Sequence, residues 1–401
     1  MSDAGQVSVR LKTLKNNAKT KDIMTNVAED ALLTAEELRL LDLDLVLDQV
    51  GTDFSKMSGK KLLITGGAGF LGYYLVQAPL HWNASNPDKP PIDVTVYDNF
   101  LRGMPDWLQD LSKDDNLTLV KHDIIEPLPA DMPAFSFIIH AAGIASPIYY
   151  RRFPLKCMDA NINGLRYLLD YSVAAKNSDT PVEAFMFYSS SEIYGDPTPE
   201  NIPTPEDYRG NVSCTGPRAC YDESKRYGET LCVNYAQQEG LQITISRPFN
   251  NYGPGLKISD RRVLPDFARN ILAGKNIEML SDGAPTRTFC YSADAISGYY
   301  KVLLSGQSGE SYNVGTETPE ISIRELAMRV TEIGKRLFGY EGEVIFAESE
   351  DKEYLVDNPQ RRCPKIDKAR AHLGYEPQVG IDEGLERAMT WYYHNPVAED
   401  A

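Results

Sequence analysis

The chain has 401 residues, 42% of them hydrophobic, which is enough for a sizeable core in one large α/β unit with a smaller lobe or in separate domains. Its formal net charge of −16 argues against nucleic-acid phosphates or an anionic membrane surface as a partner, although a local arginine cluster would still bind a small anion. The six cysteines and five histidines show no metal-ligand spacing, and no stretch approaches the roughly 20 apolar residues that span a bilayer. We therefore expect a reduced, cytoplasmic protein without a metal, membrane or nucleic-acid partner.

Residues 1–58 form an N-terminal extension whose composition differs from the rest of the chain. Its first 30 residues are polar and are expected to be disordered. Thr34 and Glu37 then form a capping-box pattern, and leucines at helical spacing follow from Leu38. The aspartates that interleave with these leucines are expected on the other face of the helix: Asp42, Asp44 and Asp48. The pattern predicts one helix packed on the domain or on a partner subunit, with a regulatory or targeting role as the alternative.

From residue 60 onward, short apolar segments alternate with longer amphipathic ones. The candidate strands are residues 62–64, 94–97, 117–120, 137–139, 185–188 and 243–245. Strands that are separated by helical stretches predict βαβ units and a parallel sheet covered on both faces. The expected fold class is therefore α/β, with a Rossmann-like, doubly wound parallel sheet in a cofactor-binding domain over residues 59–252.

The pattern changes after residue 253, where short strands mix with helices. Strands are expected near residues 312–314 and 344–346, and a helix is expected over residues 323–338. This mixture predicts a smaller α+β lobe over residues 253–401 that mainly binds the substrate.

A glycine-rich segment directly follows the first predicted strand. Gly66, Gly69 and Gly72 permit a tight turn, close approach of the backbone to a pyrophosphate and close packing of the next helix. The N-terminus of that helix then faces the anion. We assign Phe70 and Leu71 of the same loop to the dinucleotide site.

Two acidic residues follow the next two strands. Asp98 would accept hydrogen bonds from the adenosine ribose and repel a 2′-phosphate, which favours NAD over NADP, although Arg102 lies nearby. Asp123 follows the third strand, where it would bind the adenine amino group. The other residues assigned to the cofactor are Asn99, Ile124 and Ala141.

The segment 189–225 holds the groups needed to take a hydride and a proton from a hydroxyl. Tyr221 and Lys225 are four positions apart and share one helix face, so the ammonium is expected to lower the phenol pKa and make Tyr221 a base near neutral pH. Ser190 ends an apolar strand that would bring its hydroxyl to the same cleft. Glu192 adds a carboxylate that alcohol oxidation does not need; the alternatives for it are a helix cap or a partner for an arginine.

Other polar residues predict a substrate site. Arg287 lies in a half-buried strand pattern and is expected to face an anion. Asn250 follows a strand end, where its amide would bind a sugar or a phosphate. The remaining residues assigned to the substrate are Ser191, Arg218, Arg262 and Tyr291.

These motifs resemble the extended short-chain dehydrogenase/reductase superfamily from residue 60 to about residue 393, and within it most closely the UDP-glucuronate decarboxylases, also called UDP-xylose synthases. The particular matches are GGAGFLG at 66–72, DNF at 98–100, HDIIEPL at 122–128, SEIYGDP at 191–197 and GPRACYDE at 216–223. The resemblance implies a bound NAD that is reduced and reoxidised within one turnover, a UDP-sugar substrate and a homodimer. One departure is Gly255, which replaces the family's arginine, with Lys257 or Arg262 as possible compensation.

The resemblance also implies roles for the catalytic residues. Tyr221, helped by Lys225, would take the proton from the sugar 4-hydroxyl, which Ser190 would hold. The 4-ketone places the C6 carboxylate β to a carbonyl, so that CO2 leaves and UDP-glucuronate becomes UDP-xylose. Glu192 and Arg287 would act around C5 and the carboxylate or diphosphate.

Three alternatives remain open at the level of sequence. A nucleotide-sugar 4,6-dehydratase would use Glu192 to remove the proton from C5. A 4-epimerase would need no carboxylate beside C5. A non-catalytic NAD-sensing scaffold subunit would use the N-terminal extension for interaction, but the intact Ser190, Tyr221 and Lys225 argue against it.

Overall fold

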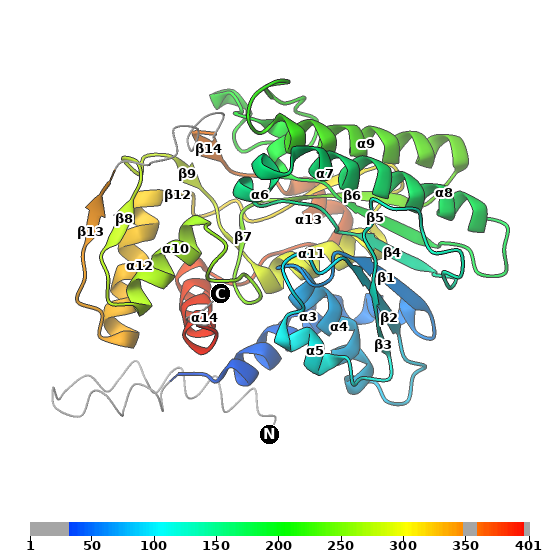
Figure 1. Cartoon of the computed structure of the whole chain (residues 1–401), viewed down its shortest axis with the longest axis horizontal. Coiled ribbons are helices and arrows are strands. Elements are labelled where there is room, and N and C mark those ends of the chain that lie inside the picture. The colour runs from blue at the N-terminus through cyan, green and yellow to red at the C-terminus, as the bar shows by residue number, and fades with distance from the viewer. Residues whose placement is uncertain (1–31, 348–358, 397–401) are drawn as a thin grey trace.

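The computed structural model describes residues 32–347 and 359–396, so the expectation for the first 30 residues lies outside the described part. Seven parallel strands form the main sheet in the order β11-β6-β5-β4-β1-β2-β3 (Figure 1). Their bounds are β1 Lys61–Thr65, β2 Asp93–Asp98, β3 Leu117–Lys121, β4 Phe137–His140, β5 Ala184–Tyr188, β6 Ile243–Pro248 and β11 Ser311–Val314. The predicted Rossmann-like sheet is confirmed.

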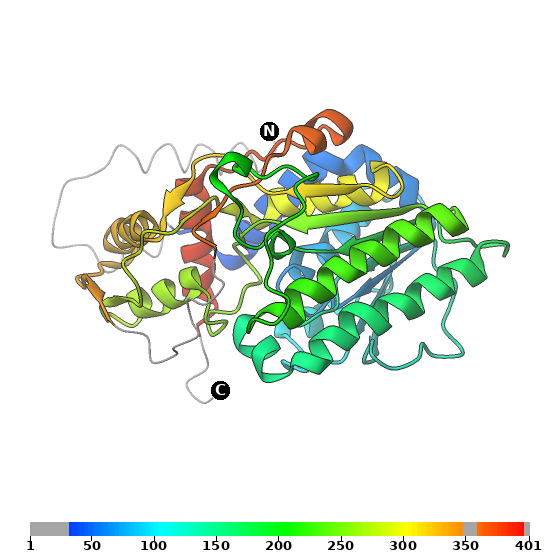
Figure 2. The ribbon, with the colours of Figure 1, turned by 90° about the horizontal axis from the view of Figure 1, so that it is seen from above.

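The two faces of this sheet carry separate helical layers (Figure 2). Successive residues of a strand point to opposite faces. Leu62 and Ile64 therefore pack into one core, while Leu63 packs into the other. The first core lies under α3 (Ala35–Phe54), α4 (Gly72–Ser85) and α11 (Ser292–Ser305). The second lies under α8 (Leu165–Ala175) and α9 (Ala219–Glu239).

Strand β11 is placed differently from the sequence expectation. The sequence pattern around residues 312–314 predicts a strand of the C-terminal lobe, but β11 pairs in parallel with β6 at the edge of the main sheet. Its residues Tyr312 and Val314 are fully buried in the core that α11 covers. The chain thus contributes a strand to the main sheet again after residue 253. The sequence analysis places a single domain boundary near that residue and does not predict this return.

A smaller lobe packs at one end of the sheet (Figure 1). Its helices are α10 (Val263–Leu272), α12 (Ile323–Phe338) and α14 (Ile381–His394), and α12 has the predicted bounds. Its short strands pair as β13 (Val344–Phe346) with β8 (Ile277–Met279), β10 (Cys290–Tyr291) with β7 (Asn251–Tyr252), and β12 (Ile321–Ser322) and β14 (Arg361–Arg362) with β9 (Thr286–Arg287). The other α-helices within residues 32–347 and 359–396 are α5 (Asp106–Leu111), α6 (Pro147–Arg152), α7 (Pro154–Asp159) and α13 (Asp367–Leu373).

The N-terminal extension contains the predicted helix, α3, and Thr34 and Glu37 form the predicted capping box. One expectation for its faces is wrong, because Asp42 is fully buried although Asp44 is exposed. Asp42 is buried because hydroxyl and guanidinium donors from other elements surround its carboxylate. Within the described ranges, none of the helices combines the length and apolar character needed to cross a membrane.

Candidate active site

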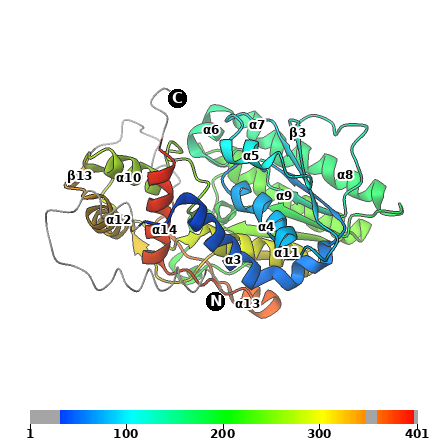
Figure 3. The ribbon, with the colours of Figure 1, turned by 90° about the horizontal axis from the view of Figure 1, so that it is seen from below.

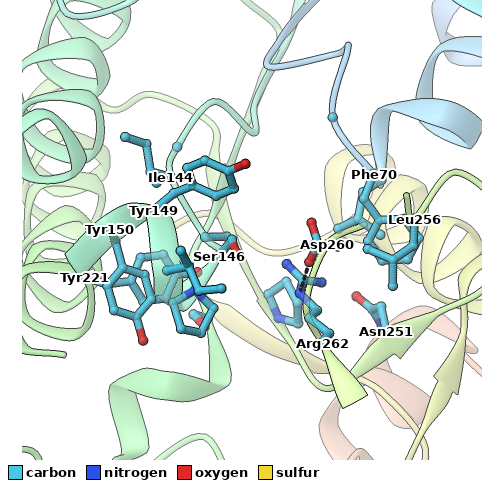
Figure 4. Close-up of a pocket in the computed structure, with 18 of the residues that line it drawn as sticks. Phe70, Ile144, Ser146, Tyr149, Tyr150, Tyr221, Asn251, Leu256, Asp260 and Arg262 are labelled. Atoms are coloured by element: carbon cyan, nitrogen blue, oxygen red, sulfur yellow. Dashed lines mark ion pairs between the residues drawn. The ribbon is translucent and has the colours of Figure 1, made fainter. Parts of the chain in front are cut away.

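A cavity of about 1030 Å³ opens between the carboxyl end of the main sheet and the C-terminal lobe. This is the position at which open α/β sheets bind ligands. Tyr150 and Tyr221 lie on one wall, and Phe70, Leu256 and Arg262 lie on the opposite wall (Figure 4). The volume is at the upper end of the roughly 300–1,000 Å³ range of ligand pockets, which leaves room for a dinucleotide beside a second ligand.

The glycine loop has backbone geometry that only glycine permits. Gly66 has φ +77°, and a Cβ there would lie 2.6 Å from the Cα of Ala142. A Cβ on Gly72, the first residue of α4, would lie 2.0 Å from the carbonyl oxygen of Gly67. The loop therefore packs tightly onto the start of α4, as a pyrophosphate cradle requires. The loop residues that line the cavity include Gly66, Gly69, Phe70, Leu71 and Gly72.

Asp98, at the end of β2, is tied to this loop. Its carboxylate accepts hydrogen bonds from the backbone N–H of Ala68 at 3.0 Å and of Phe100 at 2.8 Å. Burial raises the pKa of Asp98, and the two N–H donors act in the opposite direction. The neighbouring cofactor residues line the same wall: Asn99, Asp123, Ile124 and Ala141. The donors and acceptors of this wall fit NAD at the place the sequence predicts.

Arg102, which the sequence leaves as a possible partner for a 2′-phosphate, is engaged elsewhere. Its guanidinium pairs with Asp260 of the C-terminal lobe at 2.7 Å, and Arg262 pairs with the same carboxylate at 3.0 Å (Figure 4). The Asp260 side chain is only 1% exposed, and Lys257 donates to the Arg102 carbonyl at 2.9 Å. This bridge between the two lobes engages the Arg102 guanidinium with a buried carboxylate, which supports the preference for NAD.

Gly255 shows why the arginine of the family pattern is absent here. Gly255 has φ +89°, and a Cβ at this position would lie 2.4 Å from the Cβ of Tyr73. The close approach of Tyr73 leaves no space for a larger side chain. Lys257 and Arg262, the two candidates for compensation, are both engaged in the bridge between the lobes.

The catalytic face of α9 carries Tyr221 and Lys225, both buried at the cavity wall. Lys225 donates from Nζ to the Tyr188 carbonyl at 2.6 Å, and burial lowers its pKa to about 8. Burial raises the pKa of Tyr221 well above its usual value, although a hydrogen bond with Ser190 works in the other direction. The net shift of the Tyr221 pKa is therefore upward and not downward as the sequence predicts, because desolvation outweighs the effect of the neighbouring ammonium.

Ser190 and Tyr150 complete the surroundings of Tyr221. Ser190 precedes a short 3-10 turn, and its Oγ accepts from the Glu192 N–H at 3.2 Å. Tyr150 stacks on Tyr221 with ring centroids 5.3 Å apart and an interplanar angle of 12° (Figure 4). The Tyr150 hydroxyl is buried without a hydrogen-bond partner among the described residues. The sequence alone does not assign Tyr150 to the site.

Glu192 lies between two guanidinium groups. Arg362 donates to its two oxygens at 2.6 and 2.5 Å, and Arg218 pairs with it from the start of α9. Burial alone would raise the pKa of Glu192, but the charges and hydrogen bonds of Arg362 and Arg218 outweigh burial and lower it to about 2. Glu192 is therefore an anion at any physiological pH.

Arg287 is the third arginine of this cluster and lies on β9, beside β14. It donates to the carbonyls of Thr286, Pro359 and Gln360 at 2.7, 2.5 and 3.1 Å, and burial together with the charge of Arg362 lowers its pKa to about 9. Three guanidinium groups thus gather around one carboxylate, and the cluster is positive overall. We call Arg218, Arg287, Arg362 and Glu192 the arginine cluster.

The structure corrects the assignment of Tyr291. Its side chain is buried away from the cavity, and its hydroxyl donates to Asp42 of α3 at 2.6 Å. Asn250 does line the cavity, where it has φ +41° and its amide donates to the Thr288 carbonyl at 2.9 Å. Ser191 and Arg262 also line the cavity, and their assignment to the substrate stays a prediction.

Comparison with known proteins agrees with this geometry. The profile of the NAD dependent epimerase/dehydratase family matches residues 62–315. UDP-glucuronic acid decarboxylase 1 of Xenopus tropicalis is 36% identical over 343 residues, which cover 84% of this chain and 73% of that protein. UDP-glucuronic acid decarboxylase 6 of Arabidopsis thaliana is 37% identical over 328 residues, which cover 82% and 87%.

Among solved structures, dTDP-glucose 4,6-dehydratase from Streptomyces venezuelae, crystallised with NAD, matches with a TM-score of 0.71 and 27% identity. The match covers 84% of this chain and 97% of that one. The chain therefore belongs to the NAD dependent epimerase/dehydratase family, of the extended short-chain dehydrogenase/reductase type, and its cofactor is NAD.

Proposed function

We propose that the protein decarboxylates UDP-glucuronate to UDP-xylose through a 4-keto intermediate. The observation that carries this proposal is the arginine cluster, which places positive charge next to Ser190 and Tyr221. A substrate that fits must present an anionic group close to an oxidisable hydroxyl. A uronic acid does so, and the relatives at 36% and 37% identity are named for this reaction.

The first half of the reaction oxidises C4 of the sugar. The glycine loop and Asp98 would hold NAD, which would supply the acceptor and donor for the hydride of C4. Ser190 holds the 4-hydroxyl, and Tyr221 takes its proton. Because burial raises the pKa of Tyr221, its ionisation depends on positive charge nearby, and Lys225 carries the nearest ammonium on the same helix face.

The second half follows from the position of the ketone. The C5–C6 bond breaks, CO2 leaves, and the electron pair forms an enolate at O4. The hydroxyls of Tyr221 and Ser190 donate hydrogen bonds to that oxygen and stabilise its charge. C5 takes a proton from solvent and Tyr221 gives its proton back to O4, while the bound cofactor would supply the hydride that C4 regains. One CO2 is then lost without net oxidation.

The second candidate function is that of a 4,6-dehydratase, because the chain is similar in structure to the Streptomyces enzyme of that activity. Dehydration needs a base that removes the proton from C5. Glu192 is a weak base here, because Arg362 and Arg218 hold its pKa near 2. Decarboxylation removes no proton from C5, so the arginine cluster favours it.

We also propose a cytoplasmic homodimer. Large apolar side chains are exposed on α7 and α9, with Leu155 at 73%, Met158 at 36% and Tyr227 at 47% exposure. Such a surface is typical of a helix-to-helix interface between subunits. Light scattering of the Leu155→Asp variant tests this interface. A variant that remains a dimer would contradict it.

The proposed cytoplasmic location rests on the cysteines. They are scattered along the chain and form no disulfide among the described residues, which supports a reducing compartment.

The direct test of the reaction is incubation with UDP-glucuronate labelled at C6. Decarboxylation releases the label as CO2, whereas dehydration of a neutral hexose nucleotide leaves UDP-glucuronate intact. Retention of all label in the nucleotide sugar would refute the proposed reaction.

A further inference from the structure

Helix α3 of the N-terminal extension lies across both parts of the protein (Figure 3). It packs between α4, which begins at the glycine loop, and α14 of the C-terminal lobe, and it also covers α11. The sequence gives α3 no catalytic role, since it precedes the first strand of the Rossmann domain. Its contacts nevertheless reach elements that carry both halves of the active site.

The central contact is made by Asp42, which is fully buried. One carboxylate oxygen accepts from Arg387 of α14 at 2.6 Å. The other accepts from the hydroxyls of Tyr74 on α4 at 2.5 Å and Tyr291 on β10 at 2.6 Å. Three elements thus meet at one carboxylate, and charge-assisted hydrogen bonds of this kind fix both distance and direction.

A second contact follows along the same helix. Gln49 donates to Asp294, at the start of α11, at 2.9 Å. The Asp294 carboxylate also accepts from the backbone N–H of Gln378 at 2.9 Å and of Val379 at 2.8 Å, in the segment before α14. Helix α3 is therefore linked to the C-terminal lobe at two places, directly through Asp42 and by way of Asp294 through Gln49.

Two of the residues that bind Asp42 lie close in the chain to residues of the active site. Tyr74 lies two positions after Gly72, the residue that packs against the pyrophosphate loop. Tyr291 lies four positions after Arg287, and its strand β10 pairs with β7 next to Asn250. A shift of Asp42 would move the cofactor loop relative to the strand segment that holds Arg287.

We propose that Asp42 is a positioning residue and that α3 is a brace, which fixes the distance between the NAD loop and the substrate arginine Arg287. In this arrangement α3 contributes to the geometry of the active site. The inference rests on the proposed function for its kinetic consequences, but its effect on NAD release does not depend on which sugar is converted.

The test compares Asp42→Asn with Asp44→Asn in the full chain. Asp44 lies two residues further along α3, is exposed, and pairs with His81 of α4 at 2.7 Å, so it is a matched control. Asp42→Asn should release NAD roughly tenfold faster, because one charged acceptor with three donors is lost. It should also release more keto intermediate together with reduced nicotinamide, since misplaced lobes fail to return the hydride. Asp44→Asn should match the parent protein in both measurements.

A folded Asp42→Asn protein, shown by an unchanged circular dichroism spectrum, with parental NAD release and parental coupling would overturn the proposal. If Asp42→Asn does not fold, the Tyr74→Phe, Tyr291→Phe double variant keeps the rings and removes two donors, and it should show the same two effects. Parental behaviour of that folded double variant would equally overturn the brace. Failure of the parent protein to decarboxylate would refute the proposed function, while the NAD-release comparison would still decide the role of Asp42.

Discussion

Arg362 holds both carboxylate oxygens of Glu192, at 2.6 and 2.5 Å, from a strand that lies 170 residues further along the chain. Together with Arg218, this pairing makes Glu192 a fixed anion within a positive cluster. We therefore propose that Glu192 orients guanidinium groups toward the substrate and does not exchange a proton with C5. Under this proposal the pairing favours decarboxylation over dehydration.

Arg362→Ala should weaken the use of UDP-glucuronate strongly. The change leaves Glu192 with one fewer cation and removes a donor from the arginine cluster, so kcat/KM should fall by about 10²-fold or more. The broken buried pair should also destabilise the protein by roughly 3–5 kcal/mol. Steady-state kinetics and urea unfolding measure the two effects.

Arg361→Ala is the matched control for that variant. Arg361 is the preceding residue of β14, its side chain is 45% exposed, and it pairs with Glu320. An exposed pair contributes about 0–1 kcal/mol, so both activity and stability should stay near the parental values. Equal losses in the two variants would contradict a specific role for Arg362.

Glu192→Gln should change the pH dependence of stability. The pKa of Glu192 in the folded protein, about 2, lies below its ordinary value of 4.5, so the ionised carboxylate stabilises the fold above pH 4.5. That contribution is lost as the pH falls from 4.5 toward 2. Glu192→Gln should therefore be less stable than the parent at neutral pH, and denaturant titrations should show the difference shrinking in that window. A difference that stays constant with pH would contradict the pairing.

The pH profile of kcat/KM should report Lys225. Burial lowers the pKa of Lys225 to about 8, so its ammonium is charged below that pH and neutral above it. Because Tyr221 needs positive charge nearby, kcat/KM should fall as the pH rises through about 8. A rate that keeps rising across that range would show that ionisation of Tyr221, and not the charge of Lys225, controls the step.

The parts of the site that the sequence predicts are encoded by local spacing. Gly66 to Gly72 form one turn, Asp98 ends the next strand, and Tyr221 and Lys225 share one helix face, so each set is visible within a short window. The strands of the main sheet are predicted for the same reason, since each is a short apolar run.

The remaining features depend on contacts between distant segments. Arg362 and Glu192 meet only because β14 pairs with β9, and a single arginine in a short strand has no pattern of its own. The sequence pattern predicts that Asp42 faces solvent. Its burial follows from Tyr74, Tyr291 and Arg387, which come from distant segments and donate to its carboxylate. The raised pKa of Tyr221 likewise depends on burial, which spacing within a helix does not reveal.

Mass spectrometry of the nucleotide sugar after incubation with UDP-glucuronate tests the proposed decarboxylation without relying on any variant. We expect a product lighter by CO2, formed without net reduced nicotinamide, and a loss of about 10²–10⁴-fold in rate for Tyr221→Phe, which removes the proton acceptor. Unchanged UDP-glucuronate, with turnover of a neutral hexose nucleotide in its place, would contradict the proposed decarboxylation.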